Sequence, residues 1–321
     1  MNVAFVFPGQ GSQSIGMLAT LASRFPIIQN TFDHVSERLG YDVWQLTQQG
    51  PESLLNQTEH TQVAVLTADV AIFRLIQSQA RFDSLNCWMA GHSLGEYAAL
   101  VCAEAIPLAD AAELVATRGK LMQTCTPLGE GAMAAIIGLT DAEIDVLCQR
   151  VSASFQQQYQ VTPANYNAIG QVVIAGHTEA VEKAIGEAES LGARMAKIIP
   201  VSVPCHCPLL TEAAEAFEAP LAKAPFQAPR YPVIANVDLS TYKTPEQMRL
   251  LLKKQLYSPV RWVETIQSLK NQGVECLIES GPGNVLSGLV KRIDKTLSAL
   301  PTHQEDFLER ALRRITNEQL T

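Results

Sequence analysis

The stretch "AGHSLGEYA" at residues 90–98 restricts the fold more than any other part of the chain. It contains the pattern Gly-x-Ser-x-Gly, with Ser93 between Gly91 and Gly95, after an apolar run and before a helix-forming one. The two glycines permit a sharp turn from a strand into a helix, on which the serine oxygen is exposed. This context favours a serine nucleophile over the other interpretation, a serine that only caps the helix.

Elsewhere, short apolar runs alternate with helical periodicity, which predicts an α/β fold with a mostly parallel sheet covered on both faces. We expect strands of this sheet at 2–7, 87–92, 233–237 and 276–280. We expect helices at about 26–39, 61–79, 94–104, 108–125, 208–222, 245–256, 260–272, 284–293 and 303–314.

The middle of the chain has a pattern of its own. Strands are expected at 132–138, 161–166, 171–176 and 194–201, with helices from the capping box of Thr140 and Glu143 to about 158 and at about 178–191. This β-α-β-β-α-β order is the ferredoxin-like unit. We therefore predict a ferredoxin-like domain at 129–201, inserted into a large hydrolase-like α/β domain made of 1–128 and 202–321.

Charge, hydropathy and cysteine content argue against several classes of protein. The formal net charge of -8 disfavours nucleic acid as a partner. Because no apolar run reaches roughly 18 residues and no secretory signal pattern is present, we expect no membrane span and a cytoplasmic location. The seven cysteines are scattered and odd in number, which disfavours a disulfide framework. Cys205 and Cys207 flank His206, but a metal site needs further ligands and no second cluster has zinc-like spacing.

A nucleophilic Ser93 needs a base, for which His206 is the best candidate. The adjacent His92 is expected to be structural, because consecutive side chains diverge on such a turn. His206 stands where the chain returns from the small domain to the large one, bracketed by Pro204 and Pro208, and clefts form between domains. A buried structural histidine is the alternative. Since no acidic residue is clearly placed to orient His206, we expect a dyad in which a backbone carbonyl holds the imidazole.

Arg118 is the second informative residue. In the helix at 108–125 it falls within the apolar stripe, at helical spacing from Leu114 and Leu121. A buried guanidinium needs a carboxylate, which either the protein or a ligand supplies. The planar guanidinium can donate two parallel hydrogen bonds to the two oxygens of a carboxylate. The sequence leaves both sources of the carboxylate open.

The loop "FPGQGSQ" at 7–13 follows the first strand and is rich in glycine. It lacks the lysine and the spacing of a phosphate-binding P-loop. Gln10 in this loop is a candidate donor to an oxyanion, and the backbone N–H of Leu94 points into the same space as the serine oxygen at a helix N-terminus.

Eight ordered segments span nearly the whole chain: "FVFPGQGSQ" at 5–13, "AGHSLGEYAAL" at 90–100, "RGKLMQ" at 118–123, "GAMAAIIGL" at 131–139, "GQVVIAG" at 170–176, "PVSVPCH" at 200–206, "QLYSPVRW" at 255–262 and "SGPGNVL" at 280–286. This series resembles the malonyl-CoA:acyl carrier protein transacylases of bacterial type II fatty-acid synthesis. The resemblance implies a large α/β domain with a ferredoxin-like insertion. It also implies malonyl-CoA and acyl carrier protein as partners, a monomer, and no resident cofactor, since the phosphopantetheine belongs to the carrier protein.

The resemblance also implies roles for individual residues. Ser93 would take the malonyl group, with His206 as general base and later acid, and the main-chain carbonyl of Gln255 would orient His206. Gln10 and the Leu94 N–H would form the oxyanion hole. The remaining implied positions are Arg118 as the clamp for the malonyl carboxylate, and Gln62 and Asn165 in the lining of the cleft.

Three departures from the family pattern affect only loop detail and pocket shape. Cys205 stands where serine is usual, "NAIG" at 167–170 replaces a Ser-Pro pair, and Val63 replaces a common proline. A basic patch for the acidic carrier protein is expected at Lys291, Arg292 and Lys295, or at Arg194 and Lys197, although a solvated helix face is equally compatible with these charges. The competing functions are a thioesterase or lipase-like hydrolase, which shares the serine turn, and a non-catalytic scaffold.

Overall fold

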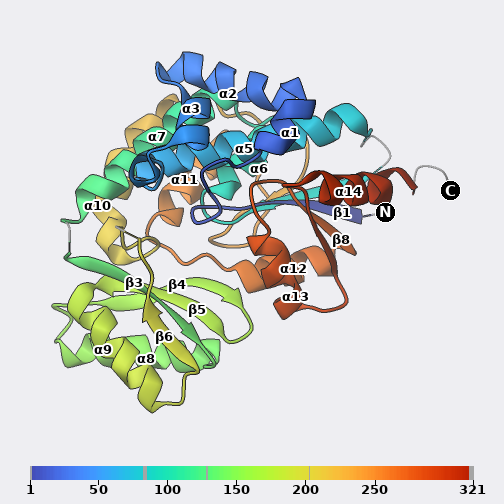
Figure 1. Cartoon of the computed structure of the whole chain (residues 1–321). Helices are drawn as coiled ribbons and strands as arrows, with labels where there is room; N and C mark the ends of the chain where they lie inside the picture. The colour runs from blue at the N-terminus through green and yellow to red at the C-terminus, as the bar shows by residue number, and fades with distance from the viewer. Residues whose placement is uncertain (1, 82–84, 128, 202, 318–321) are drawn as a thin grey trace.

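The computed structural model describes residues 2–81, 85–127, 129–201 and 203–317, and these form a large and a small part (Figure 1). The sheet of the large part has the order β7-β2-β1-β8-β9, and all of its pairs are parallel. Its strands are β1 (Asn2–Phe7), β2 (Asn86–Gly91), β7 (Val233–Ile234), β8 (Cys276–Glu279) and β9 (Ser298–Pro301). The predicted parallel sheet is therefore confirmed.

Helices cover both faces of this sheet because its strands are apolar on both sides. In β1, Val3, Phe5 and Phe7 belong to one core, whereas Ala4 and Val6 belong to another. The second core is closed by α12 (Trp262–Asn271) and α13 (Val285–Ile293), which lie below the sheet in Figure 1. The remaining helices of the large part are α1 (Ala19–Arg24), α2 (Pro26–Leu39), α3 (Val43–Gln49), α4 (Glu52–Leu55), α5 (Thr58–Gln79), α6 (Gly95–Cys102), α7 (Leu108–Cys125), α10 (Thr211–Lys223), α11 (Pro245–Gln255) and α14 (Glu305–Asn317).

The small part is an antiparallel sheet with two helices on one face. Its order is β4-β5-β3-β6. The elements are β3 (Gly131–Ile137), α8 (Asp141–Ser154), β4 (Val161–Ala168), β5 (Gln171–His177), α9 (Thr178–Ser190) and β6 (Met195–Ile198). This order confirms the ferredoxin-like prediction, and the capping box of Thr140 and Glu143 begins α8 as expected. The domain boundaries at 129 and 201 stay a prediction.

Several predicted boundaries were wrong. The helix expected to reach about 158 ends at Ser154, and Gln156 and Gln157 have φ values of 53° and 64°, which a helix does not allow. The strands expected at 194–201 and 233–237 have only four and two residues. β9 was missed because four residues ending in a proline give no periodic signal. The helices α1, α3 and α4 were missed because they are also too short to show a helical period.

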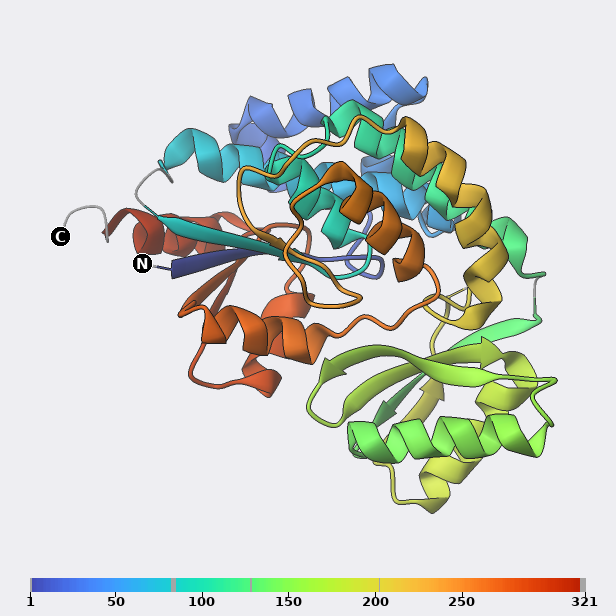
Figure 2. The same cartoon turned by 180° about the vertical axis from the view of Figure 1, so that it is seen from behind.

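The fold brings two loops of the large part together at one edge of the parallel sheet. Phe7 and Gly91 are partners in the β1–β2 ladder, so the loop after β1 lies beside the serine turn after β2. The small part joins the same region, since Tyr166 N–H donates to the Val260 carbonyl at 3.0 Å and Val260 N–H to the Ala164 carbonyl at 2.8 Å. Figure 2 shows the small part below the large one from behind. No described helix combines the length and apolar character that a membrane span requires.

Candidate active site

The turn after β2 places Ser93 in the left-handed region, with φ 53°. Only glycine fits on either side of it: a Cβ on Gly91 would lie 1.9 Å from the Gly95 carbonyl carbon, and one on Gly95 would lie 2.0 Å from the Phe7 oxygen. The side chain of Asn236 holds the turn, because its Oδ1 accepts from Ser93 N–H at 2.8 Å and its Nδ2 donates to the Gly91 carbonyl at 2.7 Å. The sequence pattern thus produces the strained strand–turn–helix geometry typical of nucleophilic serines.

His206 lies directly against Ser93. Its Nε2 is 2.7 Å from Ser93 Oγ, and its Nδ1 is 2.7 Å from the Gln255 carbonyl oxygen. Because a carbonyl only accepts, Nδ1 carries the hydrogen and Nε2 is left as the acceptor for the serine hydroxyl. Burial, together with the charge of Arg118, lowers the pKa of His206 to about 3, so the imidazole is neutral near pH 7. This arrangement allows His206 to take the proton of Ser93.

The imidazole of His92 is hydrogen-bonded to the small part. Its Nε2 lies 2.8 Å from Oδ1 of Asn167 in the small part, and its ring packs edge-on against Trp262 at 5.5 Å. The contacts of His92 are those of a residue that connects the two parts of the molecule.

Arg118 reaches the site from α7, where it is only 1% exposed. A close approach of α7 to α5 places it there, since a Cβ on Gly119 would lie 2.5 Å from Glu59 Cα. In the part of the chain that the structure describes, its hydrogen-bond partners are neutral. They are Gln62 Oε1 at 2.9 Å, Gln255 Oε1 at 2.9 Å and Ser93 Oγ at 3.3 Å. The guanidinium therefore has no protein carboxylate against it there and is free to pair with one on a ligand.

Three residues behind the serine were missed by the sequence reasoning. Glu96 on α6 is buried and accepts hydrogen bonds from the Gln255 side chain at 2.6 Å, from Asn236 N–H at 3.3 Å and from the Tyr242 hydroxyl. Burial raises the pKa of Glu96 to about 7. An acidic residue in the apolar run "GEYAALVC" was a signal that could have marked Glu96. Nothing in the sequence indicated Asn236 or Tyr242.

Ser93 and His206 open onto a cavity of about 100 Å³. The large part lines it with Gln10, Gln62, Leu94, Arg118 and Met122 among others, and the small part with Met133, Asn165, Ile199 and Val201. The loop that carries Gln10 packs directly on the turn, because a Cβ on Gly9 would lie 2.6 Å from the His92 oxygen and 3.7 Å from Leu94 N. Of the predicted site residues, only Gln255 is not in the lining. It lies behind His206 and holds it.

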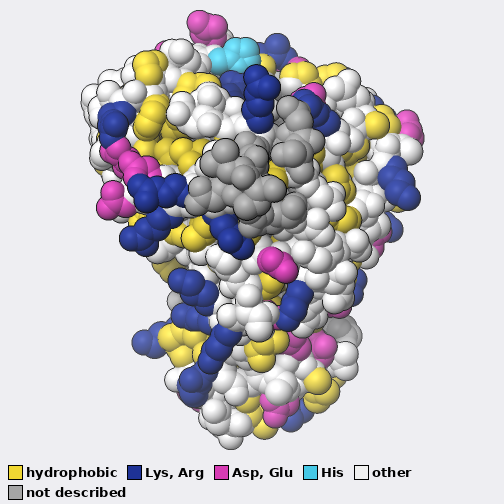
Figure 3. Space-filling model, turned by 90° about the vertical axis from the view of Figure 1, so that its right-hand side faces the viewer, with side chains coloured by type: hydrophobic (Ala, Val, Ile, Leu, Met, Phe, Trp, Pro, Cys, Tyr) yellow, Lys and Arg dark blue, Asp and Glu magenta, His cyan; other side chains and the backbone are white. Residues whose placement is uncertain are grey.

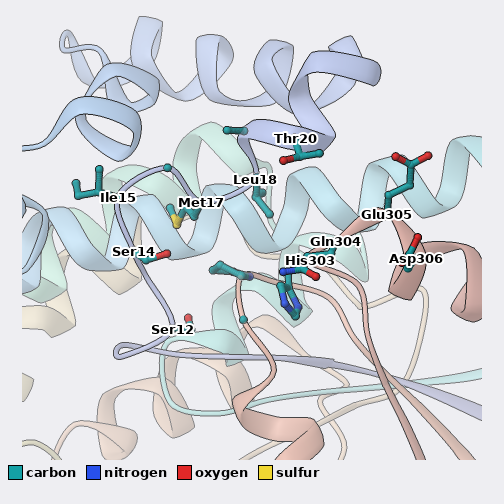
Figure 4. Close-up of a pocket in the computed structure, with 14 residues that line it drawn as sticks. Ser12, Ser14, Ile15, Met17, Leu18, Thr20, His303, Gln304, Glu305 and Asp306 are labelled. Atoms are coloured by element: carbon teal, nitrogen blue, oxygen red, sulfur yellow. The ribbon is translucent and has the colours of Figure 1, made fainter.

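A second cavity, of about 540 Å³, lies beyond the same loop (Figure 4). Residues from Ser12 to Thr20 and from His303 to Asp306 form most of its walls. Neither Ser93 nor His206 lines it, so we assign the chemistry to the smaller cavity. Among the described residues, no group of three His, Cys, Asp or Glu side chains is arranged to hold a metal ion.

Comparison with known proteins identifies the family. The family model for the acyl transferase domain matches residues 4–317. The malonyl CoA-acyl carrier protein transacylase of Escherichia coli (strain K12) is 50% identical over 309 residues, which are 96% of this chain and 98% of that protein. This chain belongs to the malonyl CoA-acyl carrier protein transacylase family.

Solved transacylase structures share the whole fold. That of the Coxiella burnetii malonyl CoA-acyl carrier protein transacylase has a TM-score of 0.94 and 48% identity, over 98% of each chain. A malonyl-transacylase solved in complex with its type II PKS acyl-carrier protein has the same TM-score and identity, over 98% of this chain and 100% of that one. Membership in this family favours an acyl transferase over the hydrolase and scaffold interpretations.

Proposed function

We propose that this protein transfers a malonyl group from malonyl-CoA to the phosphopantetheine thiol of acyl carrier protein, for fatty-acid biosynthesis. The observation that supports this best is the chain of hydrogen bonds from the Gln255 carbonyl through His206 to Ser93. The buried Arg118 adds a guanidinium nitrogen, Nη2, 3.3 Å from Ser93 Oγ. The names of the related proteins support the same reaction. A monomeric state and a cytoplasmic location stay expectations.

In the first half-reaction Ser93 Oγ attacks the thioester carbonyl while His206 Nε2 accepts its proton. The Leu94 N–H and the Gln10 side chain stabilise the negative charge that develops on the carbonyl oxygen. The C–S bond then breaks, and CoA leaves as a thiol with the proton from His206. A malonyl ester on Ser93 remains.

The second half-reaction runs the same steps in reverse with a different thiol. The phosphopantetheine thiol gives its proton to His206 and attacks the malonyl ester. As the ester bond breaks, Ser93 recovers the proton from His206. All of these steps use side-chain and backbone groups of this chain and the two thiols.

Arg118 accounts for the choice of malonyl. The free carboxylate of a malonyl group pairs with the guanidinium, whereas an acetyl group brings no partner. Leaving a buried polar group unpaired costs about 1–3 kcal/mol, and more when it is charged. The site therefore selects for an acyl group with a terminal carboxylate.

The test is the intact mass of the protein after brief exposure to malonyl-CoA. We expect one malonyl adduct on the wild type, none on Ser93→Ala, and loss of the adduct when holo carrier protein is added, with the malonyl group recovered on the carrier. Release of free malonate without carrier protein would instead support the hydrolase interpretation. Absence of any adduct on the wild type would refute the proposal.

Exposed basic residues on both parts of the molecule support an acidic partner. Lys291 and Arg292 are exposed on α13, and Arg292 Nη1 donates to Gln171 Oε1 of the small part at 2.5 Å. Arg194 and Lys197 are exposed on the small part. On the face that Figure 3 presents, Lys and Arg side chains lie on both the upper and the lower half of the molecule, and several of them form a group at the lower left. We propose that carrier protein docks on this side.

Charge reversal tests the docking side. The double change Lys291→Glu and Arg292→Glu is expected to raise KM for holo carrier protein about tenfold at low salt, because an attractive surface becomes repulsive. KM for malonyl-CoA should stay the same. Lys223→Glu, an exposed change at the end of α10, is the matched control. An unchanged carrier KM in the double variant would remove this patch from the docking side.

A further inference from the structure

Glu96 is a buried acid that the reaction steps above do not use. It is 1% exposed on the first turn of α6, directly behind Ser93. Its Oε1 accepts from the Tyr242 hydroxyl, and its Oε2 accepts from Gln255 Nε2 at 2.6 Å and Asn236 N–H at 3.3 Å. All three donors are themselves buried. Two of them, Gln255 and Asn236, hold reacting groups of the site.

We propose that Glu96 is the positioning residue of this active site, and that its carboxylate fixes Gln255 and Asn236 and through them His206, Arg118 and the Ser93 turn. This inference rests on the proposed acyl transfer. It adds a residue that acts through others and touches no substrate.

Glu96 determines which way the side-chain amide of Gln255 faces. Gln255 Oε1 accepts from Arg118 at 2.9 Å, and its Nε2 donates to the Ser93 carbonyl at 3.0 Å and to Glu96. An amide can turn over, which would place its NH₂ group against the guanidinium. A carboxylate only accepts, so Glu96 allows only the orientation that serves Arg118. The same residue supplies the main-chain carbonyl that holds His206.

Through Asn236, Glu96 also acts on the strained serine turn. Its backbone N–H is held by Glu96, while its side chain accepts from Ser93 N–H at 2.8 Å. A non-glycine residue at φ 53° persists only where its surroundings hold it. Glu96 therefore supports the serine from the backbone side as well as through Gln255.

The charge of Glu96 gives this role a measurable signature. The titratable groups that act on it are Tyr242 on the loop after β7, Tyr97 on its own helix and Arg118 on α7. Burial raises the pKa of Glu96 to about 7, whereas the pKa of His206 is lowered to about 3. The group of this network that ionises near neutral pH is thus the glutamate. As the pH rises through about 7, Glu96 gains its charge, holds its donors more firmly, and the acylation of Ser93 should become faster.

The experiment measures single-turnover acylation by malonyl-CoA between about pH 5.5 and pH 8.5, by quenched mass analysis, so that no attacking thiol adds its own titration. Glu96→Gln keeps the shape and one acceptor oxygen but does not titrate. We expect its rate to be independent of pH near 7 and to match the low-pH rate of the wild type, about tenfold below the wild-type rate at pH 8.5. KM for malonyl-CoA should not rise, because the charge of Arg118 is retained.

Two further variants separate this role from a loss of structure. Tyr242→Phe removes a hydrogen bond that lowers the pKa of Glu96, so the rise in rate should move to higher pH. Glu279→Gln is the matched control, because Glu279 is also a buried carboxylate, one that accepts from Leu286 N–H and Ser287 N–H at the start of α13. It should keep the wild-type pH profile whatever it does to the melting temperature.

The outcomes distinguish this inference from the proposed function. A wild type that forms no malonyl-Ser93 at any pH refutes the acyl transfer itself. A wild type that acylates, with Glu96→Gln showing the same rate and the same pH profile, overturns only the role of Glu96. A rise in rate that disappears in Glu96→Gln and moves upward in Tyr242→Phe supports it.

Discussion

The large and small parts of the molecule line the same cavity with different kinds of side chain. The large part contributes the hydroxyl of Ser93, the imidazole of His206 and the guanidinium of Arg118. The small part contributes Met133, Asn165, Ile199 and Val201, none of which ionises. Since the carboxyl ends of parallel strands leave loops free for reacting groups, we place the proposed chemistry on the large part. The small part forms one wall of the pocket.

The largest effect should come from the large part at His206. His206→Ala removes the acceptor for the Ser93 proton and should lower the rate of acylation by about 10³-fold. Stopped-flow release of CoA measures it. His303→Ala, in the wall of the larger cavity, is the control and should leave the rate within about threefold. Equal losses in both variants would contradict the assignment of chemistry to the smaller cavity.

Arg118→Ala should have the next largest effect. It removes the partner of the malonyl carboxylate, so kcat/KM for malonyl-CoA should fall about 10²-fold, which corresponds to roughly 2.7 kcal/mol. The slow reaction with acetyl-CoA should change far less, because acetyl never used the charge. Arg118→Lys keeps the charge but loses the planar guanidinium. Its kcat/KM for malonyl-CoA should lie between those of the wild type and Arg118→Ala. A parallel loss with both substrates would mean that Arg118 serves the structure rather than the choice of substrate.

Features formed by residues close together in the sequence could be predicted, whereas groups formed by distant segments could not. The serine turn and α6 were predictable because the glycine spacing is local, and His206 because two prolines bracket it at the return from the small part. The group around Glu96 was not predictable, since residues 96, 236, 242 and 255 come from separate segments that meet only in the fold. The Gln255 carbonyl was expected only from the family resemblance, because a backbone group leaves no mark in the residue types.

The smallest effect should come from the small part at Asn167. Asn167→Ala removes the hydrogen bond to His92 and leaves a half-buried imidazole nitrogen unpaired, at a cost of about 1 kcal/mol in the free energy of unfolding. Denaturant titration measures this loss, with the exposed Gln158→Ala as control. The acylation rate should stay within about threefold, since Asn167 reaches Ser93 only through a residue that takes no part in proton transfer. A loss of rate like that of Arg118→Ala would show that the small part also positions the reacting groups. The small part would then be more than a lining of the cavity.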